Sequence, residues 1–314
     1  MARVKYLSCN TLSIMVERIK ATSILNKLKN HDSWFLNDYS ATPYRGCQFG
    51  CLYCYIQGSK YGNHTAGSLA VKANAPELFA RQLRRRAEKK EYGFIFLGSS
   101  TDPYMPLEEE SMLTRRLLDL ILSYRFPVEV CTKSTLVTRD IDLLQKINET
   151  AILPVDLEGK LDHRAIVAFS LSTVDDGLAA IFEPGAPAPS ERFKAMKKCK
   201  DAGLLVGVNL MPVLPGLSDD VESIDRAVSL ARQHGADYIL AGGLTLFGNG
   251  PGDSKTKYFE ALGRHFPELL PRYESLFLDN VHQPQVFQAG LEKLARMACE
   301  RHGIRYGILP CRSS

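Results

Sequence analysis

Three closely spaced cysteines could bind a metal centre through sulfur ligands. Cys47, Cys51 and Cys54 lie in the stretch YRGCQFGCLYCYIQG with the spacing C-x3-C-x2-C. If the eight cysteines of this 314-residue chain were placed at random, this spacing would arise about 0.005 times. Gly46 and Gly50 lie beside the cysteines, and glycine lets a short loop curl so that three thiolates converge. The spacing therefore predicts a metal or cluster site.

Two kinds of metal centre use thiolate ligands. Structural zinc takes four closed ligands, and the nearest additional candidate, His64, lies ten residues beyond Cys54, outside the usual zinc spacing. An iron–sulfur cluster is usually held by four cysteines. The other cysteines are dispersed singly, at Cys9, Cys131, Cys199, Cys299 and Cys311. Three cysteine ligands leave one iron open, which favours a cluster that binds a substrate or cofactor and takes part in catalysis.

The cysteine motif resembles that of the radical S-adenosylmethionine (SAM) enzymes. Their motif, C-x3-C-x-aromatic-C, matches Cys47, Cys51, Tyr53 and Cys54. The resemblance implies a 4Fe-4S cluster whose open iron is chelated by the amino and carboxylate groups of SAM. It also implies that an electron from the cluster cleaves SAM to methionine and a 5'-deoxyadenosyl radical, which abstracts a hydrogen atom from a substrate. An external donor of the flavodoxin or ferredoxin type would supply that electron.

Within this family, residues 40–245 resemble the spore photoproduct lyase and DNA repair photolyase-like group. The shared stretches are YRGCQFGCLYCY, GSSTDPY, TKSTLVTRDIDLL, FSLST, FEPGAPAPSERFKAMKKCKDAG and NLMPVLPG. The resemblance implies a lyase-like enzyme whose substrate is a nucleic-acid base lesion. The alternatives are radical modification of RNA, of a peptide or of a small metabolite.

Residues at the ends of predicted strands are the candidates for contacts with SAM. Thr101 and Asp102 end the second strand, where a hydroxyl and a carboxylate could receive the amino group of the methionine moiety. Lys133 ends the third, and a lysine there is costly to bury unless it meets an anion such as the SAM carboxylate. By resemblance Ser170 contacts the ribose or methionine end, and Asn209 could bind ribose hydroxyls. A surface lysine and ordinary strand hydroxyls are the alternatives.

Two tyrosines and one loop accompany these candidates. By resemblance, Tyr53 packs near the adenine, while Tyr55 lines the cavity or relays a radical; ordinary packing is the alternative for both. Residues 183–187 (EPGAP), followed by Arg192, resemble a loop that the family keeps beside the cofactor. The prolines and the glycine of this loop also suit a rigid connector.

The chain departs from the lyase group at the position of the hydrogen-atom donor. The lyases use a cysteine after the second strand to return a hydrogen atom to the product radical, but here the equivalent stretch carries Ser99 and Ser100. A serine O–H bond is too strong to replace that thiol. Cys131, two residues before Lys133 and on the same strand face, or a tyrosine is the candidate donor, with core packing the alternative for Cys131. The departure weighs against repair of the spore photoproduct itself.

Six predicted strands must position these residues. They are nearly continuously apolar, as parallel strands buried on both faces are, and they cover residues 39–44, 93–101, 128–135, 165–173, 204–213 and 238–244. Helical patterns separate them, from Pro76, over residues 113–121, between a capping Ser190 and Gly203, and over residues 221–235. This alternation predicts an open or closed α/β barrel with function at the carboxyl ends of its strands. The family resemblance specifies a partial (β/α)6 barrel of the TIM type.

The strand pattern also suggests how the chain is divided. We expect an N-terminal extension over residues 1–38, a radical SAM core barrel over residues 39–245, and a C-terminal extension over residues 246–314 that packs on the barrel. The C-terminal extension reads as irregular until a final helix over residues 285–302.

The composition is that of an ordinary globular protein. Hydrophobic residues make up 45% and charged residues 24%, which excludes a disordered chain, a collagen and a disulfide-dense scaffold. No stretch resembles a signal peptide or a membrane span, so we expect a cytoplasmic protein with no membrane partner. Cysteines are seldom paired in that compartment, and we expect Cys199 and Cys299, which fall in helical patterns, to be small buried apolar residues. Nothing in the sequence specifies an oligomeric state.

The charge balance permits nucleic-acid binding without requiring it. There are 39 basic and 35 acidic residues, a net charge of +4. The run RQLRRRAEKK over residues 81–90 is a solvated helix face in the simplest interpretation and a nucleic-acid contact in the alternative. A function of a different class would be a non-catalytic, metal-containing module that binds nucleic acid through this face. It would leave Asp102, Lys133 and Ser170 without a purpose at the strand ends.

Overall fold

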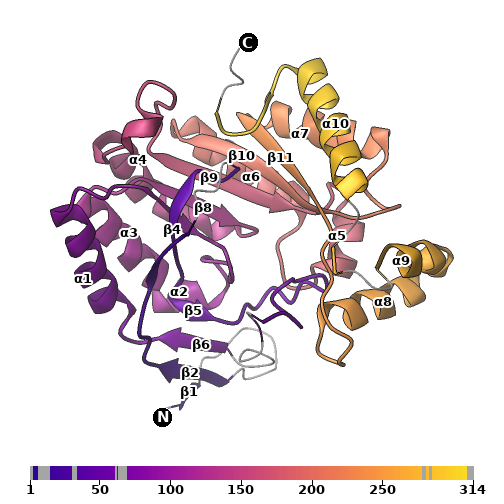
Figure 1. The fold of residues 1–314 in the computed structure, drawn as a ribbon, viewed down its shortest axis with the longest axis horizontal. Helices are drawn as coiled ribbons and strands as arrows, with labels where there is room; N and C mark the ends of the chain where they lie inside the picture. Colours follow the sequence, from indigo (N-terminus) through magenta and orange to yellow (C-terminus); the bar gives the residue numbers. More distant parts are fainter. Residues whose placement is uncertain are drawn as a thin grey trace. The chain divides into compact units, whose positions relative to one another are not determined.

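Parallel strands alternate with helices through most of the structure, which is a computed structural model (Figure 1). It describes residues 3–5, 15–29, 34–60, 62, 69–277, 281–282 and 285–309. The chain divides into two compact units. Unit 1 holds Met1–Gln48, Gly67–Ala168 and Lys198–Leu205, and unit 2 holds Phe49–Ala66, Phe169–Lys197 and Val206–Ser314. The division falls inside the cysteine motif, because Cys47 belongs to unit 1 whereas Cys51 and Cys54 belong to unit 2.

The larger sheet of unit 1 is built on three parallel strands. They are β4 (Asn37–Ala41), β7 (Phe94–Leu97) and β8 (Val128–Thr132). All four residues of β7 are buried, as the apolar run FIFL predicts for a central parallel strand. Strand β3 (Leu25–Lys27) pairs antiparallel with β4, so the sheet is mixed.

Amphipathic helices follow these strands in unit 1. The main ones are α1 (Ala75–Glu88), α3 (Leu113–Tyr124) and α4 (Ile141–Thr150), and the smaller elements are α2 (Leu107–Ser111) and the 3-10 turns η1 (Thr135–Asp140) and η2 (Val155–Leu157). Helices α1 and α3 lie side by side, and α3 also contacts α4 (Figure 1). Pro76 stands in the first turn of α1, where its missing N–H is not needed.

A second sheet in unit 1 holds the segment just before the cysteine motif. Its strand order is β1 (Arg3–Lys5), β2 (Met15–Ile19), β6 (Leu69–Lys72) and β5 (Tyr44–Arg45). The single strand predicted over residues 39–44 is therefore wrong, because it divides into β4 and β5 at Thr42 and Pro43. Proline has no N–H to donate to a ladder, so the chain leaves one sheet there and enters the other.

Unit 2 has its own parallel strands, β10 (Leu205–Val213), β11 (Tyr238–Gly243) and β12 (Arg305–Tyr306). Strands β9 (Ala165–Leu171) and β10 begin in unit 1 and continue in unit 2, while helix α6 (Pro189–Asp201) runs from unit 2 into unit 1. Helix α5 (Asp176–Phe182) follows β9. Helix α10 (Gln285–His302) packs on α7 (Val221–Gln233) and on β11 (Figure 1).

Two helices occupy a segment that the sequence predicted to be irregular. They are α8 (Ser254–His265) and α9 (Leu270–Phe277), joined by the 3-10 turn η3 (Pro267–Leu269). Tyr258, Leu262, Tyr273 and Phe277 from these helices are buried in an apolar cluster of unit 2. The glycine-rich stretch before α8 and the proline between the helices hid this periodicity.

The prediction that Ser190 caps α6 is also wrong. Ser190 lies within the first turn of α6, and its hydroxyl donates to Oδ2 of Asp176 over 2.6 Å. The remaining strand and helix predictions agree with the structure within a few residues, so the α/β class is confirmed. Closure into a partial barrel and the division into a barrel with two extensions stay predictions. No helix in the described part of the chain has the length and apolar character needed to cross a membrane.

Candidate functional site

The cysteine motif lies in a tight loop with glycines at two of its bends. Gly46, with a φ of 79°, precedes Cys47 in unit 1, and Gly50, with a φ of 60°, precedes Cys51 in unit 2. These backbone angles favour glycine over other residues. Within unit 2 the Cys54 N–H donates to the Cys51 carbonyl over 3.1 Å, which closes a turn. The local backbone therefore curls as the sequence predicted.

The three motif thiols are suited by their chemistry to bind an iron–sulfur cluster. Cys47, Cys51 and Cys54 are each partly exposed and none forms a disulfide. Among the described residues no three His, Cys, Asp or Glu side chains are gathered as a metal site. Ligation of a cluster by these cysteines thus stays a prediction. His64, the additional zinc candidate, lies outside the described residues.

Tyr53, between two motif cysteines, anchors the loop in unit 2. Its ring packs in the apolar cluster that includes Phe182 and Tyr258, and its hydroxyl donates to a carboxylate oxygen of Glu183. Burial, and next the Glu183 carboxylate, raises the pKa of the Tyr53 hydroxyl well above its ordinary value. The hydroxyl therefore stays protonated and acts as a donor.

Glu183 is the centre of a buried polar network. The Ser172 hydroxyl donates to the same carboxylate oxygen as Tyr53, over 2.8 Å, and the Arg192 guanidinium forms an ion pair with the other oxygen. Arg192 also donates to the Ser170 carbonyl over 2.9 Å and to the Pro187 carbonyl over 2.8 Å. The network thus joins residues 49–54, here called the cysteine loop, to the end of β9.

Two backbone hydrogen bonds reinforce this link within unit 2. The Leu52 N–H donates to the Phe182 carbonyl over 2.9 Å, and the Gly185 N–H donates to the Phe49 carbonyl over 3.0 Å. The residues around Glu183, predicted as a loop beside the cofactor or a rigid connector, therefore hold the cysteine loop directly. A buried acidic residue has no sequence signal of its own, so its role was missed.

Asp102 joins the carboxyl ends of two strands in unit 1. Its carboxylate accepts hydrogen bonds from the Thr132 hydroxyl over 2.6 Å, the Lys133 N–H over 2.7 Å and the Tyr104 N–H over 2.9 Å. Burial raises the pKa of Asp102, and these hydrogen bonds lower it in part. The Thr101 hydroxyl lies 2.6 Å from that of Thr42. A contact of Thr101, Asp102 or Lys133 with SAM stays a prediction.

The candidate hydrogen-atom donor lies on the neighbouring strand in the same unit. Cys131, in β8, is partly exposed. A Cβ atom on Gly98 would lie only 2.3 Å from the Cys131 carbonyl oxygen, and Gly98 has a φ of 127°. Only glycine fits at this position, because any side chain would collide with the backbone of Cys131. Gly98 therefore lets the stretch that carries Ser99 and Ser100 start close to Cys131.

A second buried acid, Glu108, anchors the other side of the cysteine motif, in unit 1. Tyr44, three residues before Cys47, donates its hydroxyl to one oxygen of Glu108. The Thr114 N–H donates to that oxygen over 2.9 Å, and Arg139 forms an ion pair with the other over 2.6 Å. The sequence did not single out Glu108, because it opens the acidic run of residues 108–110, which is typical of a solvated helix start.

This network branches toward the surface of unit 1. Asp140 accepts from Arg139 over 2.8 Å and from Arg115 over 2.7 Å, and Tyr104 donates to it over 3.0 Å. Arg115 continues to Asp142 over 2.9 Å. Several acids and arginines therefore share the charge around Glu108.

The remaining candidates lie in different surroundings. Ser170 is partly buried in β9 and donates to the Met211 carbonyl over 3.2 Å, whereas Asn209 is buried in β10. Tyr55 is 43% exposed, and its role in a cavity or as a radical relay stays a prediction. Cys199 and Cys299 are buried, as predicted.

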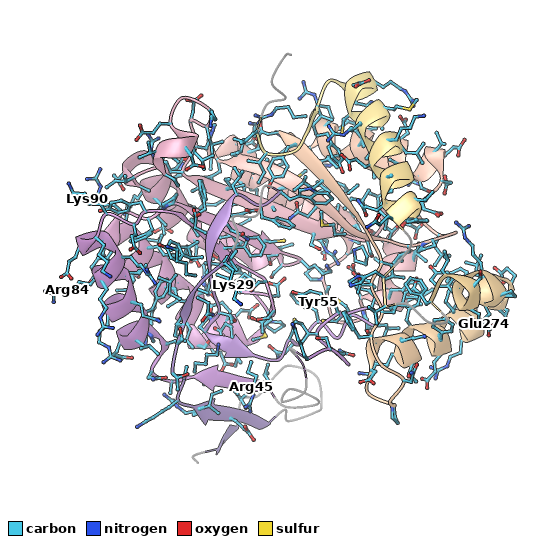
Figure 2. The ribbon with its side chains drawn as sticks, in the orientation of Figure 1. Lys29, Arg45, Tyr55, Arg84, Lys90 and Glu274 are labelled. Atoms are coloured by element: carbon cyan, nitrogen blue, oxygen red, sulfur yellow. The ribbon has the colours of Figure 1, made fainter. Side chains whose placement is uncertain are left out.

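The basic run of residues 81–90 forms the exposed face and the end of α1. Arg84 and Lys90 point away from the helix (Figure 2), and only Leu83 within the run is buried. Arg84 pairs with Glu88 over 2.9 Å. The run is therefore an exposed helix face, and a nucleic-acid contact there stays a prediction.

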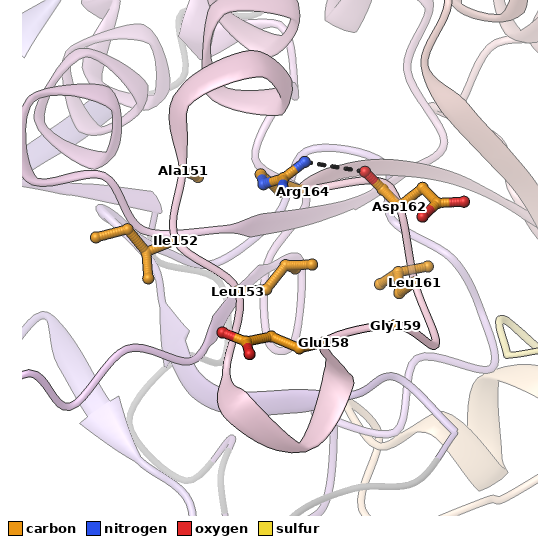
Figure 3. Close-up of a pocket in the computed structure, with 8 residues that line it drawn as sticks. All are labelled: Ala151, Ile152, Leu153, Glu158, Gly159, Leu161, Asp162 and Arg164. Carbon is orange, nitrogen blue, oxygen red and sulfur yellow. Dashed lines mark hydrogen bonds between the residues drawn. The ribbon is translucent and has the colours of Figure 1, made fainter.

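A separate hollow of about 580 Å³ lies after α4 in unit 1 (Figure 3). Eight residues between Ala151 and Arg164 line it, and Arg164 there donates to the Asp162 carbonyl over 3.0 Å. No predicted site residue lines this hollow.

Comparisons with known proteins place these features in a family context. A model of the Radical SAM superfamily matches residues 42–228, more than half of the chain. An uncharacterized protein of Mycobacterium bovis is 29% identical over 286 residues, which cover 89% of this chain and 78% of that protein. An uncharacterized protein of Methanocaldococcus jannaschii is 29% identical over 209 residues, covering 66% of this chain and 70% of that protein.

Solved structures share the fold. Spore photoproduct lyase complexed with dinucleoside spore photoproduct matches with a TM-score of 0.62 and 15% identity, covering 93% of this chain and 81% of the lyase. A mutant of that lyase with bound AdoMet and dinucleoside spore photoproduct matches with a TM-score of 0.61 and 16% identity, covering 93% and 80%. At this identity the likeness shows the fold alone.

Proposed function

Because the chain belongs to the radical SAM superfamily, we propose that it binds a 4Fe-4S cluster through Cys47, Cys51 and Cys54 and cleaves SAM reductively. The observation that carries the proposal is the family match over a segment that contains three partly exposed cysteines, outside any disulfide, with the family spacing. When bound, the reduced cluster supplies the electron that cleaves SAM to methionine and a 5'-deoxyadenosyl radical. An external flavodoxin or ferredoxin is the proposed reductant.

The strand ends of the chain would hold the cofactor. Lys133 would neutralise the carboxylate of SAM, and Thr101 with Asp102 would receive its amino group. Asp102 supports this role because its carboxylate fixes the backbone N–H of Lys133. Ser170 and Asn209 would bind the ribose or methionine end, and we expect a partial (β/α)6 barrel to bring these residues together.

A nucleic-acid base lesion is the proposed substrate. Spore photoproduct lyase shares the fold, and one of its solved structures is complexed with dinucleoside spore photoproduct. The exposed basic face of α1 would attract nucleic-acid phosphates. The product radical would take a hydrogen atom from the Cys131 thiol or from Tyr55, leaving a thiyl or tyrosyl radical. RNA, a peptide or a small metabolite is the alternative substrate.

Reconstitution tests the chemistry directly. Protein reconstituted anaerobically with iron and sulfide, then given dithionite and SAM, should form 5'-deoxyadenosine, and Cys51→Ala should abolish it. Cys199→Ala is the matched control, because Cys199, like Cys51, forms no disulfide but lies buried in α6. Unchanged turnover in Cys51→Ala would contradict the proposal.

Isotope transfer tests the substrate. Deuterated oligonucleotides carrying base lesions should pass deuterium into 5'-deoxyadenosine. Transfer from RNA, a peptide or a metabolite, with none from damaged DNA, would replace the substrate and keep the chemistry.

The exposed basic face of α1 favours one function of a different class, a metal-containing module that binds nucleic acid without catalysis. That module would bind DNA with a steep dependence on salt and would form no 5'-deoxyadenosine. Detection of 5'-deoxyadenosine in the reconstitution experiment would exclude it.

A further inference from the structure

We infer that Glu183 is a positioning residue which, through Tyr53, fixes the loop between Cys51 and Cys54 in the shape that receives the cluster. The inference rests on the proposed function. It concerns contacts that lie wholly within unit 2.

Three contacts tie the loop to the turn that carries Glu183. Tyr53 reaches Glu183 through its hydroxyl, while the Leu52 and Gly185 N–H groups pair the backbone of the loop with the turn that carries Glu183. Three links therefore join two short segments far apart in the sequence, Phe49–Tyr53 and Phe182–Gly185. A loop held this way cannot shift between its cysteines without breaking at least one link.

The polar character of this anchor needs a reason beyond packing. The Tyr53 ring is buried in an apolar cluster, where a phenylalanine would fill the same space. What the hydroxyl adds is polar contact with the buried network, above all the bond to Glu183. Glu183 in turn is 1% exposed, so its carboxylate is desolvated at a considerable cost that Arg192 must offset. A chain that needed only a packed core would gain more from apolar residues at these positions.

Arg192 extends the positioning to the strand end. It spans the Glu183 carboxylate and the carbonyls of Ser170 and Pro187, so one side chain fixes the acid relative to β9. Ser172 completes the set by donating to Glu183 and by accepting, at its carbonyl, from the Ser218 hydroxyl over 2.8 Å. The cysteine loop is thus held against residues that follow the strand carrying Ser170, a proposed SAM contact.

Two variants and one matched control test the inference. Tyr53→Phe removes the hydroxyl and keeps the ring, and Glu183→Gln keeps the shape and removes the charge. Tyr258→Phe is the control: Tyr258 is buried in the same cluster, and its hydroxyl also has a buried partner, Tyr273, at 2.9 Å, but does not bond to the cysteine loop. All three variants remove a buried polar contact from unit 2.

The first readout needs no cluster. In the protein as purified, amide hydrogen exchange at Leu52 and Gly185 should be about tenfold faster in Tyr53→Phe and Glu183→Gln than in Tyr258→Phe. The second readout is the EPR spectrum of the reduced, reconstituted protein, which should shift in the two variants and stay as in the wild type in Tyr258→Phe.

The outcomes separate the two ideas. Exchange and EPR spectra that match those of Tyr258→Phe, in protein that still cleaves SAM, would overturn the positioning role alone. Absence of SAM cleavage in the wild type would overturn the proposed function. If Glu183→Gln does not fold, Tyr53→Phe alone decides, because it changes a single hydroxyl.

Discussion

Two hydrogen-bonded networks anchor the cysteine motif, one through a tyrosine before Phe49 in the sequence and one through a tyrosine after it. Both contain a tyrosine, a buried glutamate and an arginine, but they differ in the groups that surround the ion pair. In unit 1, Tyr44 donates to Glu108, which pairs with Arg139. In unit 2, Tyr53 donates to Glu183, which pairs with Arg192. Each time a tyrosine close to a cysteine reaches a buried glutamate that one arginine neutralises.

The difference lies in what surrounds each pair. The Arg139 side chain is 22% exposed and also serves Asp140, and the network continues through Arg115 to the surface. The Arg192 side chain is 1% exposed, and its other hydrogen bonds within the described part of the chain go to two backbone carbonyls. A branched network can redistribute charge and admit water when one member is lost. The fully buried pair of Glu183 and Arg192, here called the closed pair, cannot do so. Loss of the arginine should therefore change stability differently in the two networks.

The largest expected effect is the loss of the closed pair. Arg192→Met leaves the Glu183 carboxylate buried without its cation and should lower the free energy of unfolding by about 3–5 kcal/mol. Arg139→Met should cost about 1–2 kcal/mol, because Arg139 is 22% exposed, so that water can reach the vacated place beside Glu108, and because Asp140 keeps Arg115. Urea unfolding of both variants measures this difference. Equal losses would show that the branching has no protective effect.

The cysteines of the motif and those buried in the helices should also differ in their rate of alkylation. Cys199 in unit 1 and Cys299 in unit 2 are buried, and burial raises the pKa of each thiol to about 12 from an ordinary 9.0. In native cluster-free protein at pH 8, iodoacetamide should label the motif cysteines at least about a hundredfold faster than these two. Peptide mass spectrometry measures the rates. Comparable labelling in folded protein would contradict the burial described here.

The same shift has a consequence for stability at high pH. The folded pKa of these buried thiols lies above the unfolded value, so their contribution to stability is complete below pH 9. It is lost as the pH rises toward about 12.

The smallest expected effect is at the outer end of the branched network. Asp142 is half-exposed, and its hydrogen bond to Arg115 lowers its pKa below the ordinary 3.8. Asp142→Asn should cost less than about 1 kcal/mol. The difference from the wild type should be present above pH 4 and vanish as the pH falls through the lowered pKa. A loss as large as that of Arg192→Met would place Asp142 at the centre of the network instead of its edge.

The sequence predicted the elements that depend on local pattern. Strand β7 was found because FIFL is continuously apolar, and the cysteine loop because its spacing is improbable by chance. Helices α8 and α9 were missed because glycine and proline interrupt their periodicity. Glu108 was missed, and the segment of Glu183 was singled out without the buried role of its carboxylate, because a buried acid is defined by a partner distant in sequence. Glu183 and its partner Tyr53 are 130 residues apart, a relation that no local pattern carries.

The central claim is that the motif cysteines hold a cluster with one iron open to SAM. The most direct test is EPR spectroscopy of the anaerobically reconstituted, dithionite-reduced protein, before and after SAM is added, with the iron content measured on the same sample. We expect about four irons per chain and a cluster signal that SAM changes, and neither in Cys51→Ala. A bound zinc ion in place of iron, or a cluster signal that SAM leaves unchanged, would contradict the account.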